Sequence, residues 1–292
     1  MTYNLIIGDR SFSSWSLRGW LMLEKFDLDF RTTDLSLYDG SYRAVLAPMA
    51  PAKFLPVLVC PDGTVMGETM AIAEELNSRH PEAGMWPADP QARAFARWIS
   101  AEMCAGFMGL RSACPMQLLH QYMDFPVNDD VKDDLDRVQD LWVRARKRFG
   151  AEGPWLFGQY SLADAFFAPV AARIAGHGLP VDEVAAHYVT TVLADPSFRR
   201  WRALGLTKSY DPVPYAMDHP TRPWPGPAPL AAQAVTGADA VNKACPYSGD
   251  AITHCLTLDG VTYGFCNEVC RDKTVADPEA WPAFMDLVAT HS

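Results

Sequence analysis

The chain opens with an apolar strand pattern, Tyr3 to Gly8, that runs into a hydroxyl-rich loop and then into a helical pattern. The loop contains Ser11, Ser13 and Ser14. A strand that feeds a short polar loop and then a helix places hydroxyl groups and free backbone N–H groups at a helix N-terminus, where an anion is stabilised. The opening therefore predicts a site for an anion such as a thiolate or a carboxylate.

Two later segments add to this geometry. The strand pattern from Phe54 to Val59 contains Pro56, which cannot donate to a sheet ladder and is expected at a strand start or in a cis turn. Glu68 and Thr69 precede a helical run, so Thr69 is expected as the N-cap. The periodicity predicts strands at 3–8, 29–34, 56–60 and 65–67 and helices at 14–26, 41–46 and 70–79.

The serine loop, the X-Pro strand and the acidic-hydroxyl helix start resemble, in that order, the N-terminal domain of cytosolic glutathione transferases. The string Ser11-Phe12-Ser13-Ser14-Trp15-Ser16-Leu17-Arg18 is similar to the Ser-Ser-Cys-Ser-Trp opening of the zeta class. It is also similar to a bacterial branch that carries Tyr-Ser-Ser-Trp-Ser-Leu-Arg. The resemblance implies an α/β thioredoxin-like domain over residues 1–80 and a glutathione-dependent transferase or isomerase that acts on a small electrophile.

An enzyme that uses glutathione must lower the pKa of its thiol, because only the thiolate attacks electrophiles. A shift of about two units needs ~2.7 kcal/mol of anion stabilisation, which a hydroxyl donor and a helix N-terminus together supply. The resemblance offers Ser13, Ser14 and Ser11, in that order, as the activating group. The alternative is that these serines only form a capped turn.

The resemblance also implies which residues bind the tripeptide. Leu55 would pair its backbone with the cysteinyl portion, and a cis Pro56 would hold that turn. Lys53 would reach the glycyl carboxylate, Glu68 the γ-glutamyl ammonium, and Thr69 the γ-glutamyl carboxylate. Alternatively, Lys53 and Glu68 are solvated surface charges.

Residues 90–207 show apolar side chains at helical spacing and no strand pattern, so a second, all-helical domain is expected there. Ser161 and Asp164 precede an apolar run in the pattern of a capping box, for which a structural role is expected.

The electrophile is expected between the two domains, at a pocket that includes Trp15, Met103, Phe107 and Arg111. Arg111 is a lone cation among apolar residues, so it either receives a substrate carboxylate or pairs with an acid in the core. Cys104 lies on the same predicted helix and, with Cys60 and Cys114, is expected to pack as a small hydrophobic residue.

The last part of the chain has a different composition. Residues 208–242 are rich in proline and small residues and are expected to be a linker. Residues 243–288 contain Cys245, Cys255, Cys266 and Cys270, and the last two are spaced to lie on one face of a short helix. This segment resembles the small treble-clef-like YHS/TRASH metal-binding finger.

Zinc is the expected ion for such a finger, and copper(I) is an alternative for thiolate ligands. The fourth ligand is open among Cys255, His254 and the remote His291. The cysteines could also be unligated, and a disulfide is less expected in a reducing compartment. If the finger is the functional element, the transferase fold would be a non-catalytic scaffold for a metal sensor, carrier or docking module.

Charge and hydropathy limit the partners. The formal net charge of −10 argues against nucleic acid, because phosphate neutralisation needs a clustered basic surface. No apolar run approaches the ~18 residues of a membrane helix, and the start lacks a secretory pattern, so we expect a cytoplasmic protein without a membrane partner. The resemblance implies a homodimer.

Overall fold

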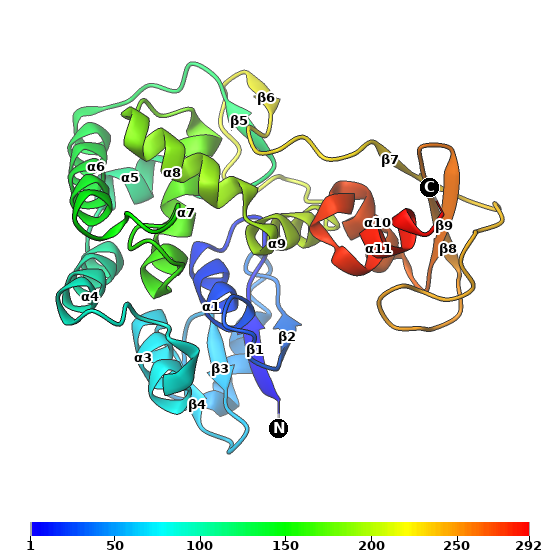
Figure 1. Ribbon diagram of the computed structural model, residues 1–292, viewed down its shortest axis with the longest axis horizontal. Coiled ribbons are helices and arrows are strands. Elements are labelled where there is room, and N and C mark those ends of the chain that lie inside the picture. Colours follow the sequence, from blue (N-terminus) through cyan, green and yellow to red (C-terminus); the bar gives the residue numbers. More distant parts are fainter. Residues whose placement is uncertain (1, 292) are drawn as a thin grey trace. The chain divides into compact units, whose positions relative to one another are not determined.

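The computed structural model describes residues 2–291, and the internal contacts divide the chain into two units (Figure 1). The first unit comprises residues 1–193 together with residues 215–225. The second unit comprises residues 194–214 and 226–292. This division differs from the predicted boundaries, because the last helix of the expected helical domain groups with the cysteine-rich segment.

The first unit begins with a four-stranded sheet in the order β2-β1-β3-β4. β1 pairs parallel with β2, while β3 pairs antiparallel with both β1 and β4. The βαβ and ββα order is that of the expected thioredoxin-like fold. The predicted strands and helices are confirmed, and their ends differ from the observed ends by no more than two residues. The elements are β1 (Tyr3–Ile7), α1 (Ser14–Glu24), β2 (Phe30–Asp34), α2 (Tyr42–Leu46), η1 (Ala47–Met49), β3 (Val57–Val59), β4 (Val65–Met66) and α3 (Thr69–Arg79).

Alternating side chains of β1 serve the two faces of this sheet, as the period of a strand requires. Ile6 packs with Leu46, Leu55 and Val57 in a cluster that also includes side chains of α2 and η1. On the other face, Gly19 lets α1 approach the sheet, because an added Cβ would lie 3.0 Å from Cγ of Pro56. This close approach fixes the start of α1 beside the turn at Pro56.

A helical region follows and is packed around α7, whose residues are all buried. α7 contacts both α1 and α4, so the helical region and the sheet domain share one core within the first unit. Asp164 and Ser161 form the expected capping box at the start of α7. The remaining elements here are η2 (Pro81–Ala83), α4 (Pro90–Ala105), α5 (Met108–Ala113), α6 (Asp129–Phe149), α7 (Leu162–His177) and α8 (Glu183–Ala194).

The structure corrects the sequence prediction for this region in two ways. The helix expected to continue through Leu110 breaks at Gly106 and Phe107, and Phe107 adopts a left-handed backbone with φ 58°. The region is also not entirely helical, because β5 (His120–Tyr122) pairs antiparallel with β6 (Thr221–Pro223). β6 lies in the segment predicted to be a linker. β5 is too short to show a strand pattern in the sequence, and the strand that pairs with it is far away along the chain.

The second unit contains a three-stranded antiparallel sheet in the order β7-β8-β9, flanked by helices. Its core includes Leu256, Tyr263, Phe265, Trp281 and Phe284, and residues of α9 contribute to it. The helix α9 is also tied to the following elements by a bidentate ion pair from Arg199 to Asp277. The elements are α9 (Pro196–Leu206), β7 (Ala232–Val235), β8 (His254–Leu258), β9 (Val261–Phe265), α10 (Glu268–Ala276), η3 (Pro278–Ala280) and α11 (Pro282–Ala289).

Among residues 2–291, no helix combines the length and the hydropathy that crossing a bilayer requires.

Candidate active site

A cavity of about 590 Å³ lies in the first unit beside the N-terminus of α1. The residues that line it come from the serine loop and the start of α1, the segment after β2, α2, the turn before β3, the start of α3, the α5 region, α7 and the segment after residue 214. These residues are Phe12, Ser13, Ser14, Trp15, Leu37, Tyr42, Phe54, Leu55, Pro56, Glu68, Thr69, Met108, Arg111, Ser112, Pro115, Met116, Arg173 and Tyr215. The structure therefore brings the separate motifs of the first 80 residues to one site.

The three candidate serines differ in their hydrogen bonds and in whether they line the cavity. Ser13 is the N-cap of α1, where its Oγ accepts from the N–H of Ser16 and donates to Oγ of Ser16 at 2.7 Å. Ser16 Oγ in turn accepts from the N–H of Gly8. Because the Ser13 proton is already used, Ser13 has the character of a capping residue. Ser11 is fully buried and does not line the cavity.

Of the two candidate serines that line the cavity, Ser14 is the one whose hydroxyl donates to no acceptor among residues 2–291. It is the first residue of α1, it lines the cavity, and its Oγ accepts a hydrogen bond from Nη2 of Arg173 at 3.3 Å. A hydroxyl that accepts from a guanidinium keeps its own O–H available to donate to an anion. The geometry therefore favours Ser14 over Ser13 and Ser11 as the donor to a bound thiolate.

Arg173 is a buried cation on α7 that forms no ion pair with a carboxylate among residues 2–291. Its Nη1 donates to the carbonyl of Cys114, and its buried Nε has no hydrogen-bond partner among residues 2–291. Burial, followed by repulsion from Arg111, lowers the pKa of Arg173 to about 10, so the group stays charged at neutral pH. An unpaired buried charge is costly, and such a group is retained where it serves an anion.

Two further arginines surround Trp15. The guanidinium carbon of Arg18 lies 4.3 Å from the Trp15 ring centroid, and that of Arg111 lies 5.0 Å from it. Arg18 donates to the carbonyl of Phe166, and burial lowers its pKa to about 9. Arg111 donates to the carbonyls of Cys104 and Gly106 and so does not pair with a core acid within the described chain. The cavity is thus positively charged although the chain as a whole is acidic.

The turn before β3 and the start of α3 lie across the cavity. The Leu55–Pro56 peptide is cis, as expected. α3 begins at Thr69 itself, so Glu68 and not Thr69 occupies the N-cap position, with φ 64°. Glu68 is exposed, whereas Thr69 is buried and its hydroxyl has no hydrogen-bond partner within residues 2–291. Burial raises the pKa of the Cys104 thiol, and the charge of Arg18 opposes this rise.

Besides Ser11, three expected site residues do not line the cavity. Lys53 is exposed and lies outside the lining. Met103, on α4, and Phe107, at the break between α4 and α5, are buried in the core and lie outside the lining. Met108, Pro115 and Met116 take their places beside Arg111.

Sequence reasoning missed Arg173 and Tyr215. Arg173 follows the apolar run 165–172 and is a lone cation in a buried helix, which is the same signal that singled out Arg111. Tyr215 lies in a proline-rich segment without periodicity. No local pattern distinguishes its role, because that role depends on the pairing of β5 with β6.

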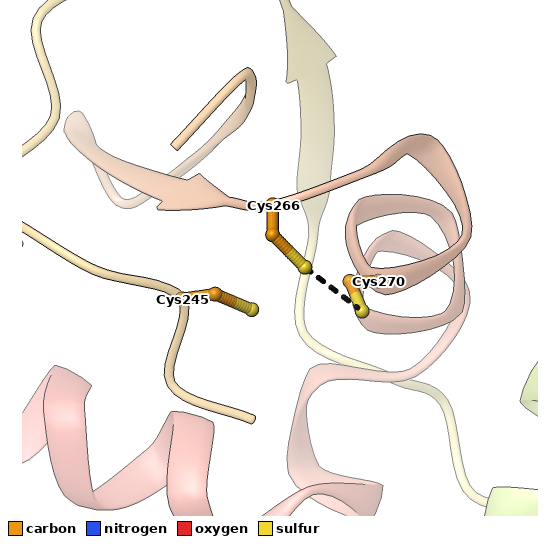
Figure 2. Close-up of side chains that lie close together, drawn as sticks. All are labelled: Cys245, Cys266 and Cys270. Atoms are coloured by element: carbon orange, nitrogen blue, oxygen red, sulfur yellow. Dashed lines mark hydrogen bonds between the residues drawn. The ribbon is translucent and has the colours of Figure 1, made fainter. Parts of the chain in front are cut away.

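A second candidate site in the second unit is formed by Cys245, Cys266 and Cys270. Their sulfur atoms all lie within 4.8 Å of one another, and those of Cys266 and Cys270 are 3.9 Å apart. Figure 2 shows that Cys245 comes from a loop, Cys266 from the end of β9 and Cys270 from the first turn of α10. The fold thus gathers three of the four cysteines expected to bind a metal.

Cys255 is not part of this group. It lies on β8, and its Sγ is directed to the carbonyl oxygen of Ala238 at 3.6 Å. His254 bonds with Thr253 through Nδ1, and neither it nor His291 joins the three sulfur atoms. The expectation of Cys255 as a fourth ligand is corrected by the strand period, which turns its side chain away from the end of β9 where Cys266 lies.

The surroundings of the three cysteines shift the pKa values of Cys245, Cys270 and the neighbouring Lys273. Burial raises the pKa of Cys245, but hydrogen bonds from the backbone N–H groups of Cys266, Tyr247 and Ser248 outweigh burial and lower the pKa to about 7. Burial raises the pKa of Cys270 to about 11. The ammonium of Lys273 lies 3.7 Å from the ring centroid of Tyr247. Burial lowers the pKa of Lys273, and the three cysteines only partly oppose this effect.

The fold and the cavity define a thioredoxin-like domain with a helical region behind it, and comparison with known proteins identifies the class of this domain. Residues 12–79 match the family model of the glutathione S-transferase N-terminal domain. The chain therefore carries such a domain. In structure it is similar to a glutathione transferase homologue from Burkholderia with bound glutathione, at 23% identity and a TM-score of 0.54 over 72% of this chain and 100% of that one.

Curated relatives are maleylacetoacetate isomerases. A probable maleylacetoacetate isomerase of Caenorhabditis elegans is 36% identical over 112 residues, which are 38% of this chain and 51% of that protein. The maleylacetoacetate isomerase of Pseudomonas aeruginosa is 26% identical over 196 residues, which are 65% of this chain and 91% of that protein. The chain spans about half the length of the nematode protein and of the mammalian relative from rat, which is 30% identical.

Proposed function

We propose that this chain is a glutathione-dependent transferase or isomerase in which Ser14 and Arg173 stabilise the glutathione thiolate. The observation that carries the proposal is the hydrogen bond from Arg173 to Ser14 at a helix N-terminus inside the cavity. A full positive charge about 6 Å from a sulfur anion is worth ~2.8 kcal/mol at an effective dielectric constant of ~20. That figure alone corresponds to about two pKa units of thiol acidification.

The rest of the tripeptide would lie along the cavity wall toward α3. The Glu68 carboxylate would hold the γ-glutamyl ammonium, and the Thr69 hydroxyl, which is buried without a hydrogen-bond partner in the described chain, would donate to the γ-glutamyl carboxylate. The backbone of Leu55, ahead of the cis Pro56, would pair with the cysteinyl residue. Lys53 would serve the glycyl carboxylate only if its exposed side chain swings toward the cavity.

The cationic wall supports an electrophile that carries a carboxylate. In an isomerisation, the thiolate adds to the carbon–carbon double bond of a conjugated cis acid, and the electron pair moves onto the carbonyl oxygen. Rotation about the new single bond follows, and the returning electron pair expels the thiolate and leaves the trans acid. Arg173 and Arg111 would hold the carboxylate and stabilise the enolate charge. Glutathione is regenerated in this sequence.

The test is retention on immobilised glutathione together with turnover of two electrophiles. Maleylacetoacetate reports isomerisation, and 1-chloro-2,4-dinitrobenzene reports conjugation with release of chloride. We expect catalysed isomerisation without net loss of glutathione. Absence of glutathione binding at millimolar concentration, together with absence of turnover of both compounds, would refute the proposal and favour the scaffold alternative.

We further propose that Cys245, Cys266 and Cys270 bind a metal ion, with zinc as the expected ion, in a treble-clef-like finger. Three thiolates around a tetrahedral zinc with Zn–S bonds of about 2.3 Å would lie ~3.8 Å apart. The Cys266–Cys270 separation of 3.9 Å fits this value. Bound zinc would stabilise the finger by joining a loop, a strand and a helix.

Metal analysis of the purified full chain tests the finger. The Cys266→Ser variant should lose about one equivalent of zinc, whereas Cys255→Ser, whose sulfur faces the Ala238 carbonyl, should keep it. Equal metal content in the Cys266→Ser variant and the unmodified chain would contradict the proposal.

The quaternary structure and location expected from the sequence are also proposals. A homodimer through α3 and α4 is supported by Trp98 on α4, which is 60% exposed. A cytoplasmic location is supported by the seven cysteines, all of which are free. Light scattering on the full chain tests the dimer: a monomeric mass at micromolar concentration would contradict it.

A further inference from the structure

The segment of residues 215–225 belongs to the first unit, although the chain on both sides of it belongs to the second. Two elements anchor it. β6 pairs with β5, and the N–H of Met123 donates to the carbonyl of Pro220 at 2.7 Å. The buried Tyr122 hydroxyl donates to the carbonyl of Tyr215 and accepts from the N–H of Met217, both at 3.2 Å. We call residues 215–225 the strap. These hydrogen bonds hold its first residue, Tyr215, at the cavity.

Tyr215 is the strap residue that lines the cavity. Its ring makes edge-to-face contacts with Phe12 at 6.0 Å and Tyr38 at 6.1 Å, and these two rings contact each other at 5.9 Å. The backbone of Tyr215 has φ 56°, a left-handed conformation that an aromatic residue adopts only where its surroundings impose it. The strap thus fixes the ring in place at a local conformational cost, which points to a role for the ring.

The position of the ring defines what it can contact. Tyr215 is 47% exposed, so part of the ring surface is not covered by Phe12 and Tyr38. Tyr215 and Arg173 both line this cavity. Tyr215 therefore borders the same cation that the proposed mechanism assigns to the thiolate and to the electrophile.

We propose that Tyr215 is a specificity-determining residue that forms the aromatic wall of the electrophile subsite. It selects electrophiles with a flat, unsaturated or aromatic body, which stacks on the Tyr215 ring while a carboxylate lies on Arg173. This inference rests on the proposed glutathione-dependent function. Tyr122 is a positioning residue in it, because its hydroxyl holds the Tyr215 backbone and its side chain does not line the cavity.

Steady-state kinetics with two flat electrophiles test this assignment on the full chain. 4-Chloro-3,5-dinitrobenzoate carries a carboxylate, and 1-chloro-2,4-dinitrobenzene does not. Loss of a ring contact worth about 1.4 kcal/mol predicts a ~10-fold higher electrophile KM for Tyr215→Leu. The KM for glutathione should stay within about twofold of that of the unmodified chain. Tyr122→Phe should raise the electrophile KM by a smaller factor without changing the KM for glutathione.

A matched control and the other outcomes complete the test. Tyr210→Leu removes a tyrosine of the preceding segment that does not line the cavity, and it should leave both KM values unchanged. If the unmodified chain turns over both compounds but Tyr215→Leu keeps its electrophile KM, the aromatic wall is refuted and the proposed function stands. A parallel rise in the KM for glutathione would also refute it. If the unmodified chain neither binds glutathione nor turns over either compound, both proposals fail.

Discussion

The division of labour between Ser14 and Ser13 gives the sharpest prediction. Ser14→Ala removes the hydroxyl that accepts from Arg173 and would donate to the thiolate. A hydrogen bond to a charged group is worth about 2 kcal/mol, so the pKa of bound glutathione should rise by ~1.5 units. At neutral pH this lowers kcat/KM by ~30-fold. The acidic limb of the pH dependence of kcat/KM, measured with 1-chloro-2,4-dinitrobenzene, reports the shift directly.

Ser13→Ala is the matched control. It removes the N-cap of α1, whose Oγ accepts from the N–H of Ser16, and should cost about 1 kcal/mol of folding free energy. For a unit of this size the expected loss in Tm is ~2–4 °C. The acidic limb should stay in place. The reasoning is refuted if Ser13→Ala shifts the acidic limb and Ser14→Ala does not.

Three further predictions concern buried charges in the first unit. Arg173→Met should lower kcat/KM for 1-chloro-2,4-dinitrobenzene by ~100-fold through lost thiolate stabilisation, and for 4-chloro-3,5-dinitrobenzoate by a further factor; equal losses would contradict a role in holding a carboxylate. Burial lowers the pKa of His177 to about 4, so the unfolded chain binds a proton that the folded chain excludes, and stability falls as the pH drops from ~6.5 toward ~4. By pH 5 the loss of folding free energy should be ~2 kcal/mol. Denaturant unfolding should show no such loss in His177→Gln, whereas the control His187→Gln, at an exposed site, should keep it. The same acid-induced loss in both variants would refute the assignment. Asp164→Ala removes the acceptor for the backbone N–H groups of Leu156 and Ser161 and should cost ~3 kcal/mol by the same assay. A loss below about 1 kcal/mol would argue against the capping box as a main support.

The sheet domain could be predicted from sequence because its signals are local. Pro56 indicates a turn before β3, the apolar run of β1 indicates a strand with two buried faces, and the serine loop indicates a helix start. Each of these signals involves residues within one element and its flanks. Their convergence on one cavity follows from the order of the strands.

The errors arise where local signals are absent or ambiguous. Met103 and Phe107 continue the apolar stripe of a helix, but Phe107 takes a left-handed backbone and ends that helix. Ser13 and Ser14 are equivalent by residue type, and only the hydrogen bonds to Ser16 and Arg173 separate them. Such assignments depend on partners that are distant in sequence.

The same holds for the cysteines and for the strap. Cys255 lies on β8, whereas Cys266 directly follows the paired strand β9, and only the sulfur of Cys266 reaches Cys270. The spacing of the cysteines does not show this difference. Tyr215 reaches the cavity through the pairing of β5 with β6, two strands that are three residues long. Strands this short have no periodicity to detect.

The central claim is that the start of α1 holds the thiolate of a bound glutathione. A crystal structure of the full chain with glutathione tests it most directly. We expect the sulfur within hydrogen-bond distance of Ser14 Oγ, with the γ-glutamyl end at Glu68 and Thr69. A glutathione that binds with its sulfur away from Ser14, or a cavity that stays without glutathione at saturating concentration, would contradict the claim.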